Sequence, residues 1–297
     1  MRLQGPSEAV WEAYPEGALG AAEAVTELGG PEGVILVLAV AYWLLDRERT
    51  ARVAAIAVAG VGFMFALKYL FALPRPPEPV LPTDTYGFPS GHAFTAVVVY
   101  GGLVYGFERH RDWRYAGLAG LLVVAIALSR VVLRLHYLGD VVVGALLGGV
   151  FLVAMDHFLD RVDATDTPRL DALDRADPTL VVGFALGLVF ATAAVLLSGF
   201  EENTVAVLGI AVGTFAASFR LEAVPPLRSR AEAIVLVACG VGYLVAVIAV
   251  LEVLVGTPTG VVQTAASVLL HAVLIAGVFL GPVVVRRVVD WRPPLDG

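Results

Sequence analysis

The side chains best suited to chemistry lie close together in the stretch 129–140, "SRVVLRLHYLGD". His136 and Asp140 are four residues apart, so at the start of a helix they share one face. A carboxylate that binds one imidazole nitrogen fixes the tautomer and leaves the other nitrogen free to act as a base or nucleophile. An aspartate that caps a helix beside a packed histidine would give the same pattern, so both interpretations stand at this point.

A second candidate is the tetrapeptide Pro89-Ser90-Gly91-His92, which directly precedes an apolar run. Proline and serine predict a helix start with Ser90 as its N-cap, and the glycine lets a ligand approach the backbone closely. Exposed N–H groups at a helix start bind anions. A serine cap beside a histidine is also a common helix start, so the tetrapeptide becomes informative only through its neighbours.

Three cations accompany these residues: Lys68, Arg75 and Arg130. Lys68 and Arg75 are seven residues apart, two helical turns, and share a face until Pro74 and Pro76 end the helix. The guanidinium fork of arginine matches phosphate oxygens, whereas lysine acts as a point charge. Each cation alone could extend to lipid headgroups. Three of them beside two histidines favour a shared anionic ligand instead.

The elements that must position these residues are membrane spans. Of the 297 residues, 58% are hydrophobic and only 16% are charged, with a mean hydropathy of +0.82. Soluble domains carry roughly 25% charged residues, and a spanning helix needs about 20 mostly apolar ones. The sequence therefore predicts an all-α, polytopic membrane bundle of about nine transmembrane helices, near 33–45, 51–72, 92–108, 114–132, 137–158, 179–199, 203–220, 231–253 and 261–284.

The distribution of basic residues predicts the orientation in the membrane. Three basic residues flank each of five span ends that alternate along the chain, so 15 of the 20 lie on one face. The positive-inside bias assigns that face to the cytoplasm, which puts the N-terminus outside and the C-terminus inside. Apart from Arg2, the basic residues of the outer face fall within 68–75 and 130–134. The ends of spans two to five meet there, so the candidate residues are expected to converge.

Taken together, these residues resemble the type 2 phosphatidic acid phosphatase superfamily. Its three motifs are K-x6-R-P, P-S-G-H and S-R-x5-H-x3-D. All fixed positions match in order, over roughly residues 50–158: Lys68 with Arg75-Pro76, then Pro89-Ser90-Gly91-His92, then Ser129-Arg130 with His136 and Asp140. The resemblance implies an all-helical bundle whose motifs cluster at one end.

The resemblance also implies a role for each matching residue. His136 corresponds to the nucleophile that attacks phosphorus, and Asp140 to the residue that orients it. His92 corresponds to the general acid for the leaving oxygen and then to the base that activates water. A phosphate-binding group is implied, consisting of Lys68, Arg75, Ser90, Gly91 and Arg130.

Four segments are predicted along the chain. Residues 1–30 mix glutamates with apolar side chains, which suits an interfacial amphipathic helical segment. Residues 31–158 are expected to form a catalytic phosphatase core of about five spans. Residues 159–178 are rich in aspartate and are expected to form a cytoplasmic polar linker. Residues 179–297 form an accessory bundle of about four spans and a short tail, with the small residues that allow close helix packing.

The predicted function is hydrolysis of a lipid phosphate monoester or diphosphate, at the non-cytoplasmic face of the cell membrane, through a phosphohistidine intermediate. We find no carboxylate cluster spaced like a metal site on this face, so we predict no cofactor and no metal. A sugar-phosphate phosphatase like glucose-6-phosphatase, a lipid phosphotransferase, and a protein that only binds or transports lipid phosphates remain alternatives. The expected partners are the phosphate ester and the bilayer, not nucleic acid, and the oligomeric state is open.

Overall fold

The computed structural model describes residues 2–83, 86–164, 176–221, 227, 229–254 and 260–290. Every regular element in these ranges is a helix, which confirms the all-α class. Within the described residues, six helices are long and apolar enough to cross a bilayer, and a seventh span results if the bent pair α2 and α3 is counted as one. The protein is therefore a multi-pass membrane protein. The count of nine crossings and their orientation remain predictions.

Each of the nine apolar runs is helical, and the third is broken into shorter pieces. The part of the chain up to residue 163 contains α1 (Gln4–Ala13), η1 (Glu16–Ala18), α2 (Leu19–Glu27), α3 (Pro31–Leu44), α4 (Arg47–Phe71), α5 (Gly91–Ala96), the π-helical η2 (Val97–Gly101), α6 (Gly102–Gly106), η3 (Arg109–Arg111), α7 (Trp113–Val132) and α8 (Leu138–Asp163). The remainder contains α9 (Pro178–Ser198), α10 (Glu202–Ser218), α11 (Arg230–Leu254) and α12 (Val261–Asp290).

Local sequence signals set the ends of the helices that lead to the candidate residues. The Asp46 carboxylate caps α4 by accepting from the Arg49 N–H. At the other end of α4, Ala72 adopts a left-handed conformation and donates to the Lys68 carbonyl, and the prolines that follow prevent further helix. Lys68 therefore lies in the last turn of α4, directly before the loop that carries Arg75.

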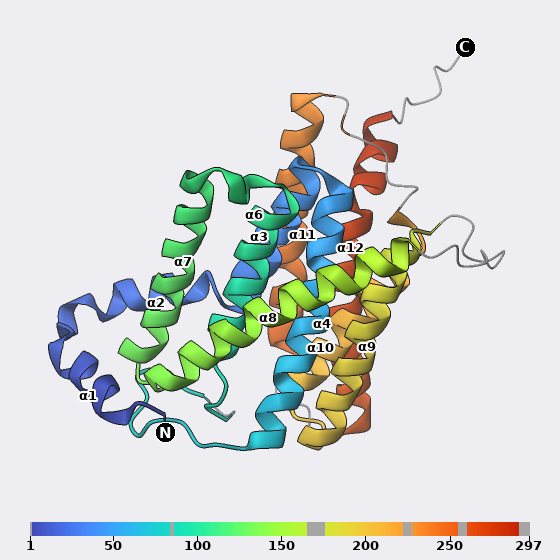
Figure 1. The fold of residues 1–297 in the computed structure, drawn as a ribbon. Helices are drawn as coiled ribbons and strands as arrows, with labels where there is room; N and C mark the ends of the chain where they lie inside the picture. Colours follow the sequence, from blue (N-terminus) through green and yellow to red (C-terminus); the bar gives the residue numbers. More distant parts are fainter. Residues whose placement is uncertain are drawn as a thin grey trace, which may run out of the picture.

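The two predicted helix bundles share one hydrophobic core. Helix α4 packs along α9, and α10 packs against both α9 and α12, so these helices stand side by side in Figure 1. Trp43 is fully buried in this core and donates through Nε1 to the Val278 carbonyl of α12, 2.9 Å away. The division at residues 158 and 179 stays a prediction; of the linker between them, 165–175 lie outside the described residues, as do 291–297 of the tail.

Helix α8 runs obliquely across the bundle and comes close to α5 (Figure 1). Two glycines allow this approach. A Cβ atom at Gly144 would collide with the Ser90 carbonyl oxygen, and one at Gly148 would lie 2.7 Å from the Phe94 carbonyl oxygen. The contact brings the start of α8 against the turn that precedes α5.

The N-terminal helices α1 and α2 cover the end of α7 and the start of α8 (Figure 1). The Trp11 indole donates to the Val131 carbonyl at 2.6 Å. Ala22 packs in a small cluster with Leu133 and Leu135, which lie between α7 and α8. The segment is thus helical and contacts the turn that carries the third motif, while its interfacial position stays a prediction.

Candidate active site

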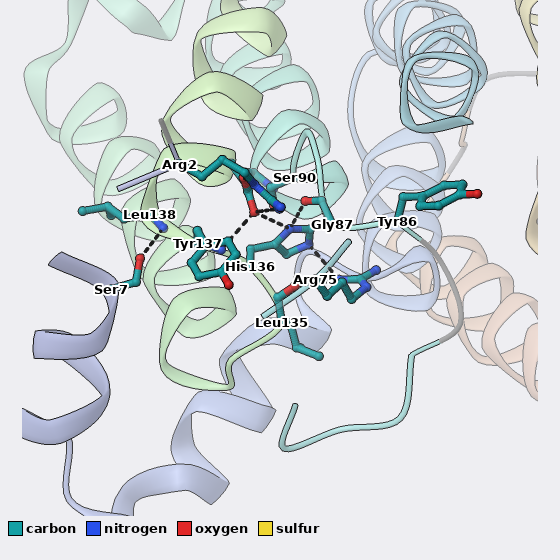
Figure 2. Close-up of polar contacts among 12 residues, drawn as sticks. Arg2, Ser7, Arg75, Tyr86, Gly87, Ser90, Leu135, His136, Tyr137 and Leu138 are labelled. Atoms are coloured by element: carbon teal, nitrogen blue, oxygen red, sulfur yellow. Dashed lines mark hydrogen bonds and ion pairs between the residues drawn. The ribbon is translucent and has the colours of Figure 1, made fainter. Parts of the chain in front are cut away.

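The predicted site residues come from four element ends that meet at one end of the bundle: the last turn of α4, the start of α5, the last turn of α7 and the start of α8. Figure 2 shows this region, with the imidazole of His136 between Gly87 and Arg75. Lys68, Ser90, Arg130, His136 and Asp140 are all buried, with exposed fractions of 4%, 0%, 7%, 1% and 0%. Polar side chains cluster here within an otherwise apolar fold.

The hydrogen bonds of His136 define its tautomer. Nδ1 lies 2.6 Å from the Gly87 carbonyl oxygen, which can only accept, so Nδ1 carries the proton. Nε2 lies 3.1 Å from the guanidinium of Arg75, which can only donate. The lone pair of Nε2 therefore points towards a cation, on the side of the ring where a nucleophile would meet phosphate.

Asp140 lies beside His136 without bonding to its ring. One carboxylate oxygen is 3.8 Å from Nδ1, too far for a hydrogen bond. That oxygen accepts instead from the Tyr137 N–H at 2.9 Å, and Arg2 binds both carboxylate oxygens at 2.6 Å. The expected carboxylate–imidazole bond is thus replaced by the Gly87 carbonyl, and Asp140 acts on the ring through space.

The first two cations donate to main-chain carbonyl groups around the site. Lys68 Nζ lies 3.1 Å from the Tyr86 carbonyl oxygen. Arg75 donates to the Leu135 carbonyl at 2.8 Å, from the same nitrogen that approaches His136. A neutral main-chain acceptor thus helps to hold each of the two side chains in place.

The third cation, Arg130, lies in the last turn of α7. It donates to the Thr26 hydroxyl at 2.8 Å, while its Nε is buried without a hydrogen-bond partner. A buried donor without a partner is costly and is usually explained by a bound group. Such an orphan N–H beside two further cations indicates an anion site.

The turn between α7 and α8 explains the spacing of the third motif. The carbonyl of Arg130 accepts from the N–H groups of both Leu135 and His136, at 3.0 and 3.2 Å. Arg134 adopts a left-handed conformation, with φ of 55°, which reverses the chain. These bonds place the imidazole of His136 next to Arg130.

The second motif lies against both of the others. Ser90 caps α5, and its N–H donates to the Asp140 carbonyl at 3.0 Å. A Cβ atom at Gly91 would lie 3.5 Å from Lys68 Cε, so the backbone of the cap is close to the cation. His92 lies within electrostatic range of His136, Arg130, Lys68 and Arg75. Both histidines are therefore at the same end of the bundle.

The electrostatics of this region favour a neutral His136. Burial, together with the positive charges of Lys68, Arg75 and Arg130, holds the pKa of His136 well below its ordinary value of 6.5. The hydrogen bond to the Gly87 carbonyl opposes this effect without overcoming it. A neutral imidazole has the free lone pair that nucleophilic attack requires.

Several residues of this region were not found from the sequence. Arg2 stands apart from the motifs as an isolated basic residue, and the sequence assigns no role to Thr26 or to the Gly87 carbonyl. The carboxylate of Glu201, the N-cap of α10, lies within electrostatic range of Lys68 and Tyr69 near the end of α4. None of these lies in a motif. The one available signal is that Arg2 is the single basic residue among residues 1–30.

In the part of the chain that the structure describes, no group of three or more histidine, cysteine, aspartate or glutamate side chains could hold a metal ion. The prediction of a metal-independent reaction stays a prediction.

Comparison with known proteins finds a family model that matches the segment with the three motifs. The model of the PAP2 superfamily matches residues 49–163. Phosphatidylglycerophosphatase B of Bacillus subtilis (strain 168) is 29% identical over 91 residues, which are 28% of this chain and 44% of that protein. The chain thus covers less than half of this relative's length.

A solved structure also resembles this one: the transmembrane PAP2-type phosphatidylglycerolphosphate phosphatase from Bacillus subtilis. The TM-score is 0.45 at 23% identity, over 52% of this chain and 83% of the other. The matched family segment contains Lys68 at its beginning and Asp140 near its end. Residues 49–163, which carry all three motifs, match the model of the PAP2 superfamily.

Proposed function

We propose that this protein is a membrane phosphatase that hydrolyses a phosphorylated lipid, with His136 as the nucleophile. The observation that carries the proposal is the state of His136: its proton is on Nδ1, and the lone pair of Nε2 faces the cationic side of the site. A protein that only bound an anion would need the cations but not an imidazole held in this tautomer.

In the first step, the Nε2 lone pair attacks phosphorus while the bond to the leaving oxygen breaks. Protonated His92 gives its proton to that oxygen, so the product leaves as an alcohol or, from a diphosphate, as the lipid monophosphate. The phosphate is then carried on Nε2, and the imidazole ring becomes positively charged. The Gly87 carbonyl and the Asp140 carboxylate, 2.6 and 3.8 Å from Nδ1, stabilise that charge.

In the second step, His92 acts as the base. It takes a proton from water as the water oxygen attacks phosphorus, and the bond between phosphorus and Nε2 breaks. The electron pair returns to Nε2, inorganic phosphate is released, and His92 is protonated again for the next cycle. Both histidines end the cycle in their starting states.

The cations stabilise charge on the phosphoryl oxygens in both steps. Phosphoryl transfer depends mainly on positioning and on fixed charges around the equatorial oxygens. Arg130 brings an N–H without a protein partner, and Lys68 brings an ammonium group held by a neutral carbonyl. Ser90 and the backbone of Gly91, at the cap of α5, complete the phosphate-binding group.

A lipid substrate is supported by the setting and by the relatives. The site lies at the ends of long apolar helices, where an acyl or prenyl chain could remain in the bilayer. The Bacillus subtilis relative bears the name phosphatidylglycerophosphatase B. The excess of basic residues at the opposite span ends supports a site on the non-cytoplasmic face.

The substrate class is tested with purified protein in detergent with EDTA present. We expect release of inorganic phosphate from at least one of phosphatidate, phosphatidylglycerol phosphate and polyprenyl mono- or diphosphate, and inhibition by vanadate. Activity on glucose 6-phosphate alone would replace the lipid substrate by a sugar phosphate. Loss of the lipid phosphate without free phosphate would identify a phosphotransferase instead.

The nucleophile is tested by His136→Ala, with His157→Ala as the matched control. His157 is an exposed histidine on the same helix that follows the turn, far from the motif residues. We expect phosphate release to vanish only in His136→Ala, and labelled phosphate trapped on the wild type to be acid-labile and alkali-stable. Unchanged turnover in His136→Ala would exclude His136 as the nucleophile, and no phosphate release from the wild type would leave only a binding function.

A further inference from the structure

Arg2 connects the first and third motifs through all of its side-chain nitrogens. Nε and one terminal nitrogen donate to the two oxygens of Asp140, each at 2.6 Å. The other terminal nitrogen donates to the Pro74 carbonyl at 2.5 Å. The main chain takes part as well, because the Arg2 carbonyl accepts from the Gly139 N–H at 3.1 Å. Figure 2 shows Arg2 lying across the start of α8.

Two further contacts fix the direction of this guanidinium. It stacks over the ring of Tyr137, with 4.8 Å between Cζ and the ring centroid. Its side chain is only 15% exposed, and the Asp140 side chain is not exposed at all. A planar fork with two parallel bonds to one carboxylate is the most directional ion pair that proteins form.

Arg2 also determines what Asp140 can do. A fully buried carboxylate needs hydrogen bonds or a counter-ion, and Asp140 has both, from Arg2 and from the Tyr137 N–H. These bonds hold one oxygen 3.8 Å from Nδ1 of His136. At that distance the carboxylate stabilises positive charge on the ring without taking the proton that fixes the tautomer.

We propose that Arg2 is a positioning residue for the reaction: it holds Asp140 beside His136 and ties the loop that carries Arg75 to the start of α8. The inference rests on the proposed function. Arg2 lies outside residues 49–163, the segment that matches the family, so this role comes from a part of the chain that the family motifs do not include. Because each of its nitrogens already binds a protein oxygen, Arg2 is not a ligand of the phosphate.

The test compares kcat and KM of Arg2→Ala and Arg2→Lys with the wild type on the same lipid phosphate. We expect kcat of Arg2→Ala to fall roughly 100-fold, the size of effect that a small misplacement of reacting groups produces. KM should change much less, since Arg2 does not bind substrate. Added guanidinium ion should restore part of kcat in Arg2→Ala only. Arg2→Lys should recover part of kcat, because lysine keeps the charge but lacks the fork.

The matched control is Arg49→Ala, at the opposite end of α4 from the site. Arg49 forms an exposed ion pair with Glu108 at 3.3 Å and contacts no residue of the site, so wild-type kinetics are expected. Wild-type or higher kcat in Arg2→Ala would overturn the inference, as would a loss that guanidinium does not relieve. If Arg2→Ala does not fold in detergent, Arg2→Lys decides: wild-type kcat overturns the inference, and reduced kcat at an unchanged melting temperature supports it. No phosphate release from the wild type would instead refute the proposed function.

Discussion

The cations at the two ends of α4 differ in their partners. Arg52, near the first turn, forms salt bridges with the Asp156 and Asp160 carboxylates of α8, at 2.9 and 2.5 Å. Lys68, in the last turn, donates to the Tyr86 carbonyl instead. The two residues are separated by sixteen positions, roughly 24 Å along a helix. One end pairs its charges, and the other keeps a positive charge buried.

This difference separates charges that serve stability from charges that serve a ligand. Paired charges near a surface contribute modestly and cost little. A buried cation with a neutral partner lowers stability, because desolvation is not compensated by an opposite charge. Residues such as Lys68 and Arg130 are therefore best explained by an anion that binds between them.

Asp140 is a carboxylate among the cations of the site, so it could neutralise them. Arg2 prevents this. Its bidentate bond satisfies Asp140 locally, so the carboxylate is not drawn to Lys68 or Arg130. The positive charge that faces the phosphate is thus preserved while one negative charge remains near His136.

Among substitutions at the two ends of the bundle, Arg130→Gln is expected to have the largest effect on activity. It should lower kcat/KM by about 10²- to 10³-fold, the usual loss for a donor that stabilises transition-state charge. The melting temperature should stay level or rise, because a buried donor without a partner is removed. Kinetics and thermal unfolding of the same preparation measure both. A clear fall in melting temperature at unchanged kcat/KM would make Arg130 a structural residue.

A smaller effect is expected for Thr26→Val, which removes the hydroxyl that accepts from Arg130 at 2.8 Å but keeps the shape of the side chain. Loss of one buried acceptor costs about 1.4 kcal/mol, so kcat/KM should fall roughly tenfold. Thr192→Val is the matched control, since Thr192 is exposed on α9 and its hydroxyl bonds only within that helix. Equal kcat/KM for the two variants would show that α2 does not contribute to the site.

The pH profile gives a third test of the cationic end. His136 must be neutral to attack, and burial and three cations lower its pKa below 6.5, so activity should persist as pH falls through 6.5 and be lost only at lower pH. In Lys68→Met one of the charges is gone, so the pKa of His136 rises and the acid limb of kcat/KM moves up. An acid limb that stays in place would show that Lys68 does not act on His136.

The helices could be predicted from the sequence because the length of an apolar run is a local property. All nine runs are helical, with ends within a few residues of the expected positions, and the all-α membrane class is confirmed. The PAP2 superfamily model matches the segment in which the resemblance was expected. The break in the third run was not predicted. Residues 97–101 form a π-helical turn that ends at the Gly101-Gly102 pair. Glycine is common in spanning helices, so this pair does not by itself predict a break.

The groups that hydrogen-bond to the site residues were harder to predict than the site residues themselves. Lys68, Arg130 and His136 carry recognisable side chains at defined spacings. The acceptor for Nδ1 of His136 is a main-chain carbonyl, at Gly87, which leaves no trace in residue type. Arg2 is 138 positions from Asp140, and only the packing of α1 and α2 on α7 and α8 brings the two together.

The smallest effect is expected at the opposite end of α4, for Arg52→Gln. The substitution breaks two salt bridges and leaves Asp156 and Asp160 close together without their cation, so the free energy of unfolding should fall by about 1 kcal/mol. Phosphate release should be unchanged, because roughly 24 Å of helix separates Arg52 from Lys68. A loss of turnover at unchanged stability would show that the two ends are coupled through α4 and α8, and the distinction between pairing charges and ligand-binding charges would then fail.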